Sequence, residues 1–445
     1  MKESVRSGRR TAGKGVKMGL SMIAVILLMS SLLGCQDGTG DADSNASDAP
    51  VSLIEEIELP KIEVTNPKLR LLVPDITLVN PAEKYLKSEY GITELETVYT
   101  PPDEKRTKLV NSIMANDFYD LYWDDYAPTL ISGGYVQAVD IDMSTALWRE
   151  VEEGNQQYMW NGSRYYVVPG FKLYNGVYYN KDMFDEAGET YPTDLFDKGE
   201  WDWDKMLELA QTLTLDSNRD GTPEQYGLGT DEPEHLLYTT GKHFITFMPD
   251  GTARNNIQSP EVARAVAYHM ELLQSKTMVP SNARQSFGEG SVAMCIGHRW
   301  YSNGYAKLIK TDDLGYAPLP RDPDADKYYT AEEGGGYYIP KYAPNPEGAL
   351  AAVNAIAYVI RSDEYVKSQY ENAIENATWT EELQKEYEKN SQIDAGVLRN
   401  WEAFGMADYF ADIWTRPASG EPWETIAAEL APKIDAKIKE LYETK

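Results

Sequence analysis

Between residues 69 and 123, short apolar runs alternate with sequences that are typical of helix starts. Residues 69–73 (LRLLV) predict a buried strand, and residues 80–83 (NPAE) predict the start of a helix that Gly91 ends. The next predicted elements are a strand at 95–100, a helix at 103–115 and a short strand at 120–123. This strand–helix–strand order is typical of a parallel sheet, so the pattern predicts an α/β fold.

Helical spacing of apolar residues recurs in the rest of the chain. Residues 204–214 predict one helix, Ser259 opens another that runs through Leu273, and Asn345 opens a third that runs to about Ile360. The last predicted helix has an apolar stripe made of Trp423, Ile426, Ala427, Leu430, Ile434, Ile438 and Leu441. We interpret these stripes as core. About 390 residues exceed what one hydrophobic core usually serves, so two lobes are expected.

The front end has a different pattern. A basic segment (residues 2–17) precedes an apolar run from Met18 to Leu33, and Gly34, Cys35 and a polar tail follow. The charge and apolar pattern indicates an export signal. The sequence around Gly34-Cys35 resembles the bacterial lipobox, which implies cleavage before Cys35 and a lipid on its thiol. A transmembrane helix is the alternative, but the apolar run is short for a span of about 20 residues.

The chain is strongly acidic, and this excludes one class of partner. Its formal net charge is −29, from 42 Lys and Arg against 71 Asp and Glu. Residues 1–34 hold six of the basic residues and one of the acidic ones, so their removal leaves −34. A surface of this charge repels polyphosphate, so we expect no nucleic-acid partner. The charge itself is interpreted as solvation of an extracytoplasmic protein.

Motifs for nucleophilic, zinc-dependent or phosphate chemistry are missing from the sequence. It has no Gly-x-Ser-x-Gly, no His-Glu-x-x-His and no Gly-rich loop with a phosphate-binding Lys. Cys295 lies in an apolar run and is interpreted as a buried small residue. The four histidines, His235, His243, His269 and His298, show no metal spacing and are interpreted as surface or packing residues.

Several motifs, in order, carry a resemblance to the family 1 extracellular solute-binding proteins, which are sugar-binding lipoproteins of ABC importers similar to maltose-binding protein. Residues 179–188 (YNKDMFDEAG) resemble the family signature, and Phe287, Gly290, Ala293, Met294 and Trp300 have the family's relative spacing. The other matching blocks are residues 201–204 (WDWD) with 207–210 (LELA), 216–227 (DSNRDGTPEQYG), 317–320 (APLP) and Asn345-Pro346. Each motif is moderate, but their order is specific and covers nearly all of the chain after Cys35.

The resemblance implies a type II periplasmic-binding-protein-like fold with two lobes and a hinge, each lobe a mixed sheet flanked by helices. We expect a signal peptide at 1–34 and the lipidated Cys35 with a tether at 35–65. Lobe 1 is expected at 66–173 plus 321–370, and lobe 2 at 174–320 plus 371–445. The expected function is to capture a carbohydrate, an oligosaccharide, between the lobes and to deliver it to the membrane subunits of an ABC permease.

Aromatic and polar residues at predicted strand ends are the candidate ligand-binding residues. The chain has 31 Tyr and 10 Trp, and sugars bind to flat aromatic plates flanked by hydrogen-bonding side chains. Ligands sit at the carboxyl ends of strands in open α/β sheets. The candidates are Trp123, Asp124, Asp125, Arg299, Trp300, Tyr301, Tyr337 and Trp401. By the resemblance, Trp300 is the main stacking residue.

Most candidates have a structural alternative, and for Trp123 and Trp300 it is packing in the core. Asp124 and Asp125 fit the helix N-cap role, and Arg299 fits pairing with a surface carboxylate. The segment 401–414 fits the apolar face of a helix. Two positions depart from the family pattern: residues 171–175 (FKLYN) replace an acidic or small residue, and Asp124-Asp125 lack the basic residue of maltose binders. Maltose itself is therefore not assumed.

One loop resembles a calcium loop. Asp216, Asn218 and Asp220 place oxygen donors at its first, third and fifth positions, with Gly221 at the sixth. Thr222 would offer its carbonyl, and Glu224 would replace the glutamate missing from position twelve, where Gly227 stands. An ordinary turn is the alternative. We expect a structural calcium here, and no cofactor required for ligand binding.

Two other function classes stay open on sequence alone. Paired carboxylates among so many acidic residues leave a surface-tethered glycoside hydrolase as a rival, and a lipoprotein adhesin or sensor is the other. Turnover separates them, because a hydrolase releases reducing sugar and a binding protein returns its ligand unchanged. The expected receptor is a non-enzymatic monomer, bound to the cell membrane through the lipid on Cys35.

Overall fold

The structure is a computed structural model. It describes residues 57–73, 79–101, 104–170, 175–248, 250, 252–305, 308, 312–332, 335–375, 379–393, 396–398 and 406–443. The chain divides into Met1–Ile54 and Glu55–Lys445, and the described residues all belong to the second unit. The signal peptide, Cys35 and Trp401 predicted above lie outside the described residues.

The first main sheet has five strands in the order β2-β1-β3-β14-β4. The strands are β1 (Lys68–Val73), β2 (Glu94–Tyr99), β3 (Leu121–Asp124), β4 (Val136–Gln137) and β14 (Gly336–Pro340). β1 pairs in parallel with both β2 and β3, which confirms the predicted strand–helix alternation. β14 comes from much later in the chain and pairs antiparallel with β3 and β4, so the sheet is mixed.

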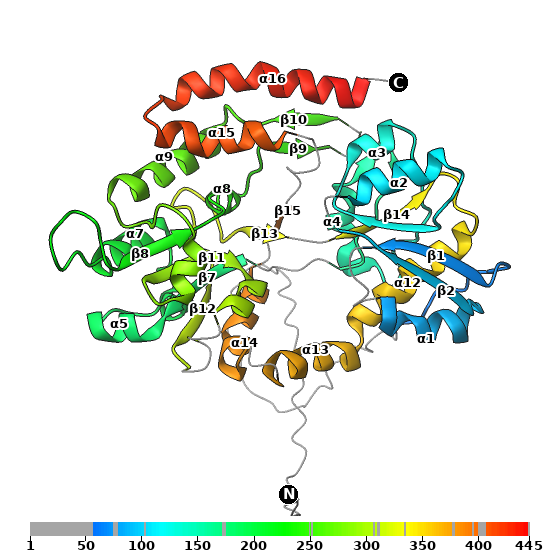
Figure 1. Cartoon of the computed structure of the whole chain (residues 1–445), viewed down its shortest axis with the longest axis horizontal. Coiled ribbons are helices and arrows are strands. Elements are labelled where there is room, and N and C mark those ends of the chain that lie inside the picture. The colour runs from blue at the N-terminus through cyan, green and yellow to red at the C-terminus, as the bar shows by residue number, and fades with distance from the viewer. Residues whose placement is uncertain are drawn as a thin grey trace, which may run out of the picture. The chain divides into compact units, whose positions relative to one another are not determined.

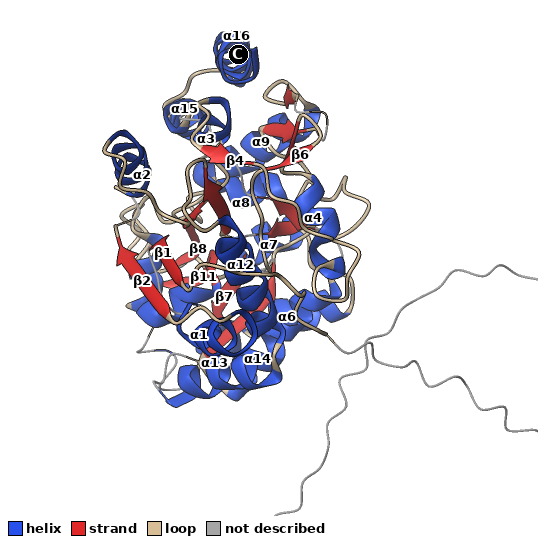
Figure 2. Cartoon of the chain, turned by 90° about the vertical axis from the view of Figure 1, so that its right-hand side faces the viewer, coloured by secondary structure: helices blue, strands red, loops and turns tan. Residues whose placement is uncertain are grey.

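Helices cover both faces of this sheet because alternate residues of its strands point to opposite sides. Leu71 of β1 packs in a core with α1 (Val79–Tyr90) and α12 (Pro346–Arg361). Leu72, the next residue, belongs to another core with Leu109 of α2 (Lys105–Met114). Figures 1 and 2 show α1 and α12 next to each other, and their residues are in contact.

The second main sheet has the order β12-β7-β11-β8, with β7 (Asn175–Asn180), β8 (Tyr226–Thr230), β11 (Val292–His298) and β12 (Leu314–Pro318). β7 is antiparallel to β11 and β12, whereas β11 and β8 are parallel. Every residue of β7 and β11 is buried, because these are the two central strands of the sheet. The helices in contact with this sheet are α6 (Pro192–Asp197), α7 (Trp203–Thr212), α10 (Ala283–Gly288) and α14 (Glu381–Tyr387).

The remaining elements of the described part of the chain include three separate two-stranded sheets as well as helices. In the first half of the chain they are α3 (Pro128–Ser132), η1 (Arg149–Val151), α4 (Glu152–Gln156), β5 (Met159–Trp160), β6 (Ser163–Arg164), α5 (Lys181–Ala187) and α8 (Glu234–Tyr238). In the second half they are β9 (Ile245–Phe247), β10 (Ala253–Asn255), α9 (Pro260–Gln274), η2 (Arg299–Gly304), β13 (Thr330–Glu332), α13 (Asp363–Glu375), η3 (Glu388–Gln392), β15 (Gly396–Leu398), α15 (Ala407–Ala418) and α16 (Trp423–Glu443).

Several predicted helix starts are confirmed by their caps. Ser259 Oγ accepts a hydrogen bond from Val262 N at 3.3 Å, and Asn345 Oδ1 accepts one from Gly348 N at 2.9 Å. Two helices start earlier than predicted. Asn80 is the second residue of α1 rather than its cap, and α7 begins at Trp203 because the Asp202 carboxylate accepts from Lys205 N and caps it.

α15 and α16 form a pair of packed helices at the C-terminal end of the described chain. The two helices pack on each other, α15 also packs on α9, and α16 contacts β10 and α3 (Figure 1). Ile426, Ala427, Leu430 and Ile434 of α16 are buried, and Trp423 and Ile438 pack partly buried against the same core, which confirms this part of the predicted apolar stripe. None of the helices in the described part of the chain is long and apolar enough to cross a membrane. The predicted lobe boundaries stay a prediction.

Candidate functional site

The predicted ligand-binding residues lie where strands of the two main sheets end. Trp123 and Asp124 are the last two residues of β3, and Arg299 begins η2 directly after β11. Tyr337 lies on β14, where it pairs in register with Trp123. The structure therefore gathers Trp123, Asp124, Asp125 and Tyr337 at one strand end, and Arg299, Trp300 and Tyr301 at another.

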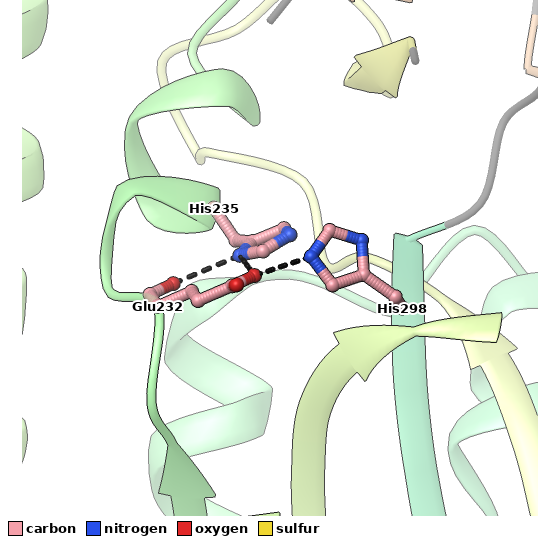
Figure 3. Close-up of side chains that lie close together, drawn as sticks. All are labelled: Glu232, His235 and His298. Atoms are coloured by element: carbon pink, nitrogen blue, oxygen red, sulfur yellow. Dashed lines mark hydrogen bonds and ion pairs between the residues drawn. The ribbon is translucent and has the colours of Figure 1, made fainter. Parts of the chain in front are cut away.

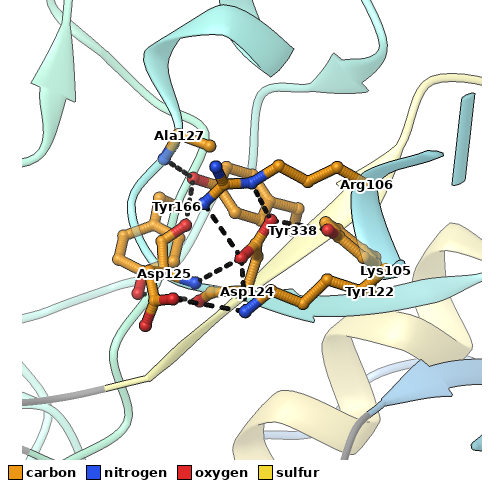
Figure 4. A network of polar contacts seen from close by, with 8 residues as sticks. All are labelled: Lys105, Arg106, Tyr122, Asp124, Asp125, Ala127, Tyr166 and Tyr338. Carbon is orange, nitrogen blue, oxygen red and sulfur yellow. Dashed lines mark hydrogen bonds and ion pairs between the residues drawn. The ribbon is translucent and has the colours of Figure 1, made fainter. Parts of the chain in front are cut away.

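Asp124 is the centre of a buried polar network (Figure 4). One carboxylate oxygen lies 2.7 Å from Lys105 Nζ, and the other accepts from Arg106 Nε at 2.7 Å and from the Tyr122 hydroxyl at 2.5 Å. The Asp125 amide donates a further bond at 2.8 Å. Asp124 is fully buried, and its oxygens are already used by the protein. In this conformation its role is to hold Lys105 and Arg106 at the end of β3.

The Asp124 charge shifts the pKa values of its neighbours. Burial by itself would lower the pKa of Arg106, but the hydrogen bonds and charge of Asp124 outweigh burial and hold it above its ordinary value. Burial raises the pKa of the Tyr122 hydroxyl far above its ordinary value, and the Asp124 charge raises it further. Arg106 therefore stays charged and Tyr122 stays a neutral hydrogen-bond donor across the physiological range.

Trp123 offers a partly buried aromatic ring beside this network. Lys105 Nζ lies 4.6 Å from the ring centre and 3.2 Å from Asp125 Oδ2. The Asp125 side chain is 49% exposed, so its carboxylate is open to solvent. Gly335 packs its backbone on the indole, and a Cβ there would lie 1.9 Å from a Trp123 ring atom. An aromatic ring, a carboxylate and an ammonium group within a few ångströms are the groups that bind a sugar face and its hydroxyls.

Tyr337 lies in the core. Its side chain is buried with Leu121 and Ile339, in the cluster that also contains α12 residues. The next residue, Tyr338, points to the other face, where its hydroxyl accepts from Ala127 N at 2.6 Å and donates to the Asp125 carbonyl at 3.3 Å. The tyrosines of β14 therefore support the end of β3 from behind, and the predicted ligand contact of Tyr337 stays a prediction.

Arg299 and Tyr301 follow β11 of the second main sheet, and both make aromatic contacts. The Arg299 guanidinium carbon lies 4.4 Å from the Trp379 ring centre and 5.2 Å from that of Tyr387. Tyr301 is buried, and its ring packs on Gly297, where a Cβ would lie 2.4 Å away. The backbone of Trp300 lies in η2, but its side chain is outside the described part of the structure, so its stacking role stays a prediction.

Sequence reasoning missed three residues at the ends of β8 and β11. His235 and His298, which have no metal spacing in sequence, lie close to each other and to Glu232. The signal that could have found them is their position: Glu232 and His298 lie at the ends of strands that pair in parallel. His243 and His269 are buried, and burial lowers the pKa of His243 to about 3 and that of His269 to about 4, which supports the packing interpretation for these two.

The predicted calcium loop is folded by its own hydrogen bonds. Asp216 carboxylate oxygens accept from Asp220 N at 3.2 Å and Gly221 N at 2.9 Å, and Asn218 Oδ1 accepts from Asp220 N at 2.7 Å. Glu224 accepts from Ser217 N at 2.8 Å and from the Asn218 amide, and Thr222 is exposed. The carboxylates of this loop, which the structure describes, do not form a cluster with ligand atoms within 4.8 Å of one another. Among the described residues, Glu232, His235 and His298 form such a cluster.

Comparison with known proteins gives a family match over most of the folded part. The model of the bacterial extracellular solute-binding protein family matches residues 74–357. The maltodextrin-binding protein MdxE of Bacillus subtilis (strain 168) is 28% identical over 294 residues, which are 60% of this chain and 65% of that protein. The match thus spans slightly less than two thirds of this curated relative.

Solved structures share the fold at lower identity. The GacH receptor of Streptomyces glaucescens GLA.O, crystallised unliganded and with acarbose, aligns with a TM-score of 0.59 and 18% identity over 84% of this chain and 98% of that one. The cyclic alpha-maltosyl-1,6-maltose binding protein from Arthrobacter globiformis aligns with a TM-score of 0.60 and 16% identity over 84% and 99%. These alignments confirm the predicted α/β, type II binding-protein fold.

Proposed function

Because the chain belongs to the bacterial extracellular solute-binding protein family, we propose that it is a lipid-anchored receptor that captures an oligosaccharide and delivers it to an ABC permease. The family consists of binding proteins rather than enzymes, and it functions outside the cytoplasm. The oligosaccharide, the lipid anchor and the permease are the parts that this proposal adds.

The observation that carries the proposal is the surroundings of Trp123 at the end of β3. The Lys105 ammonium lies over the ring and pairs with the half-exposed Asp125 carboxylate, so an aromatic ring and a solvent-accessible hydrogen-bonding carboxylate are present together. A pyranose has an apolar face and an edge of hydroxyls, and this arrangement matches both. The sequence lacks a basic residue after Trp123, but Lys105 and Arg106 at the start of α2 supply positive charge there.

A maltodextrin is the first ligand to test. The relative from Bacillus subtilis is named for maltodextrin, and the Arthrobacter globiformis protein is named for a cyclic maltosyl-maltose. A ligand that contacts both lobes would stabilise a closed form by its differential affinity for that form. In this proposal Trp300 is the main stacking residue and Trp123 is the opposing one.

The test is a thermal-shift screen of mono- and oligosaccharides followed by calorimetry of any that raise the melting temperature. A ligand that binds the folded state stabilises it by mass action. The same samples are assayed for reducing sugar, because a glycoside hydrolase would consume the ligand that a receptor returns intact. Melting curves unmoved by any sugar, or catalytic turnover, would contradict the receptor function.

The anchor is tested separately in the intact bacterial host. Metabolic labelling with a radioactive fatty acid should label the parent protein in the membrane fraction. The Cys35→Ala variant should lose the label and leave that fraction. Equal labelling of both proteins would contradict the lipid on Cys35.

A further inference from the structure

Two adjacent strands bring one glutamate and two histidines to the same edge of the second main sheet. β8 ends at Thr230, β11 ends at His298, and the two strands pair in parallel, with Ile296 opposite Thr230. Glu232 follows β8, and His235 lies in the first turn of α8. The strand pairing therefore fixes the positions from which all three side chains start.

The three side chains converge, as Figure 3 shows. One ligand atom from each lies within 4.8 Å of the other two. His298 Nε2 is 2.5 Å from Glu232 Oε2, and His235 Nδ1 is 3.7 Å from the same oxygen. Both imidazoles are buried, whereas the Glu232 side chain is 23% exposed, so solvent reaches the group from the carboxylate side.

The backbone fixes the orientation of the His235 ring. His235 Nδ1 lies 2.8 Å from the carbonyl oxygen of Glu232, and a carbonyl only accepts hydrogen bonds, so Nδ1 carries the proton. The lone pair of the neutral ring is then on Nε2, so the metal-binding nitrogen of His235 is Nε2 and not the Nδ1 that lies 3.7 Å from Glu232 Oε2. Histidines that bind metals usually have this arrangement, in which the other ring nitrogen donates to a carbonyl or carboxylate.

Aromatic neighbours hold the second ring. His298 packs edge-on against His235 at 5.2 Å and against Tyr301 at 5.3 Å, measured between ring centres. Tyr301 is itself buried over Gly297. Both imidazoles are therefore positioned by packing and not only by their contact with Glu232.

We propose that Glu232, His235 and His298 bind one divalent transition-metal ion, and that zinc fits them best. Two imidazoles and one carboxylate are nitrogen and oxygen donors of the kind that zinc takes, whereas calcium and magnesium take oxygen donors. Around zinc, with bonds of about 2.0–2.2 Å, tetrahedral ligand atoms lie about 3.3 Å apart. At 2.5 Å the contact of His298 Nε2 with Glu232 is a hydrogen bond, so zinc releases the proton between them to solvent, and the contact has to lengthen by somewhat less than 1 Å. The partly exposed Glu232 can make that movement.

Three protein ligands leave one position of a tetrahedral zinc for water or another oxygen ligand. The metal proposal does not depend on the proposed sugar-receptor function, because it rests only on the three side chains and their donor atoms. Its test accordingly uses no sugar. A failure to bind zinc leaves the receptor proposal intact, and a failure to bind sugar leaves this one intact.

The experiment is zinc titration of tag-free protein that lacks the predicted signal peptide and Cys35 (residues 36–445), stripped of metal. We expect one zinc ion per chain at saturation by calorimetry, and a melting temperature that rises with zinc concentration. Cobalt replaces zinc as a coloured probe, and its visible absorption bands should report nitrogen and oxygen ligands in a site of low coordination number.

Variants assign the ion to these residues. Glu232→Gln and His298→Gln should each weaken zinc binding at least about tenfold, since loss of a residue that only supports a ligand already costs 10- to 100-fold. His269→Gln is the matched control, because it removes a buried histidine from α9, outside the group. Circular dichroism checks that each variant is folded. Absence of zinc binding by the parent, or equal binding by parent and Glu232→Gln, would overturn the proposal.

Discussion

Arg106 donates two hydrogen bonds to Asp124, at 2.7 and 3.2 Å, and thereby joins the start of α2 to the end of β3. Lys105, the preceding residue, places its ammonium 2.7 Å from the same carboxylate. The side chains of Asp124 and Lys105 are 0% and 6% exposed, so this ion pair is out of water. Asp124 therefore pairs with both cations next to Trp123, and Asp125 supplies the second negative charge by pairing with Lys105 at 3.2 Å.

The first prediction is that Asp124→Asn destabilises the protein. The amide leaves the buried Lys105 ammonium with only the half-exposed Asp125 as counter-charge and removes the carboxylate partner of Arg106, and breaking a buried ion pair from one side costs about 3–5 kcal/mol. We expect the free energy of unfolding, measured in urea at pH 7, to fall by about 3 kcal/mol. Asp125→Asn is the control: its side chain is half exposed, so a loss below about 1 kcal/mol is expected. Equal losses in the two variants would show that Asp124 does not have this role.

The second prediction concerns acid stability and His269. Burial lowers the pKa of His269 to about 4, from an unfolded value near 6.5, and its ring lies edge-on to Trp414. A depressed histidine pKa means that the unfolded chain binds the proton first as the pH falls. The contribution of His269 to stability is therefore fully present above pH 6.5 and is lost as the pH falls towards 4. This residue should account for a loss of about 2 kcal/mol between pH 7 and pH 5.

His269→Phe keeps a ring against Trp414 and removes the titrating group. The unfolding free energy of this variant should therefore fall less steeply than that of the parent between pH 7 and pH 5. Urea unfolding at several pH values measures both slopes. Parallel slopes would mean that His269 is protonated equally easily in the folded and unfolded states.

The sequence was sufficient for features that depend on neighbouring residues. Caps such as Ser259 and Asn345 act within one turn, and the order of strands and helices in the first sheet follows from local patterns. The strand-end rule placed Trp123 beside polar groups. The family resemblance, which rests on several motifs in order, added the two-lobed fold.

What the sequence did not reveal depends on pairing between distant segments. Glu232 and His298 meet because β8 lies next to β11, and no local spacing encodes that neighbour relation. The burial of Tyr337 depends on which face of β14 points to the core, and a slip of one residue would reverse it. A surface carboxylate is one partner that the sequence suggests for Arg299. Its guanidinium instead lies over the rings of Trp379 and Tyr387, which are about 80 residues or more further along the chain.

The third prediction is that calcium binds the loop at 216–224. Asp216, Asn218, Asp220 and Glu224 supply oxygen donors, with the Thr222 carbonyl as a further one, and binding would stiffen a loop already folded by hydrogen bonds. Calcium added to metal-free protein should raise the melting temperature, and Asp220→Ala should abolish that rise. Curves unchanged by calcium, or shifted equally in both proteins, would leave the loop an ordinary turn.

The central claim is that the protein binds a sugar on the aromatic residues at its strand ends. Calorimetry of maltodextrins with the parent, Trp123→Ala and Trp300→Ala tests it most directly. Stacking on one ring is worth about 1–3 kcal/mol, so each variant should bind about tenfold more weakly or worse while staying folded. Trp423→Ala, on α16, should bind like the parent. Equal affinity in all four proteins would remove both rings from the site, and no heat with any maltodextrin or other oligosaccharide would contradict the account.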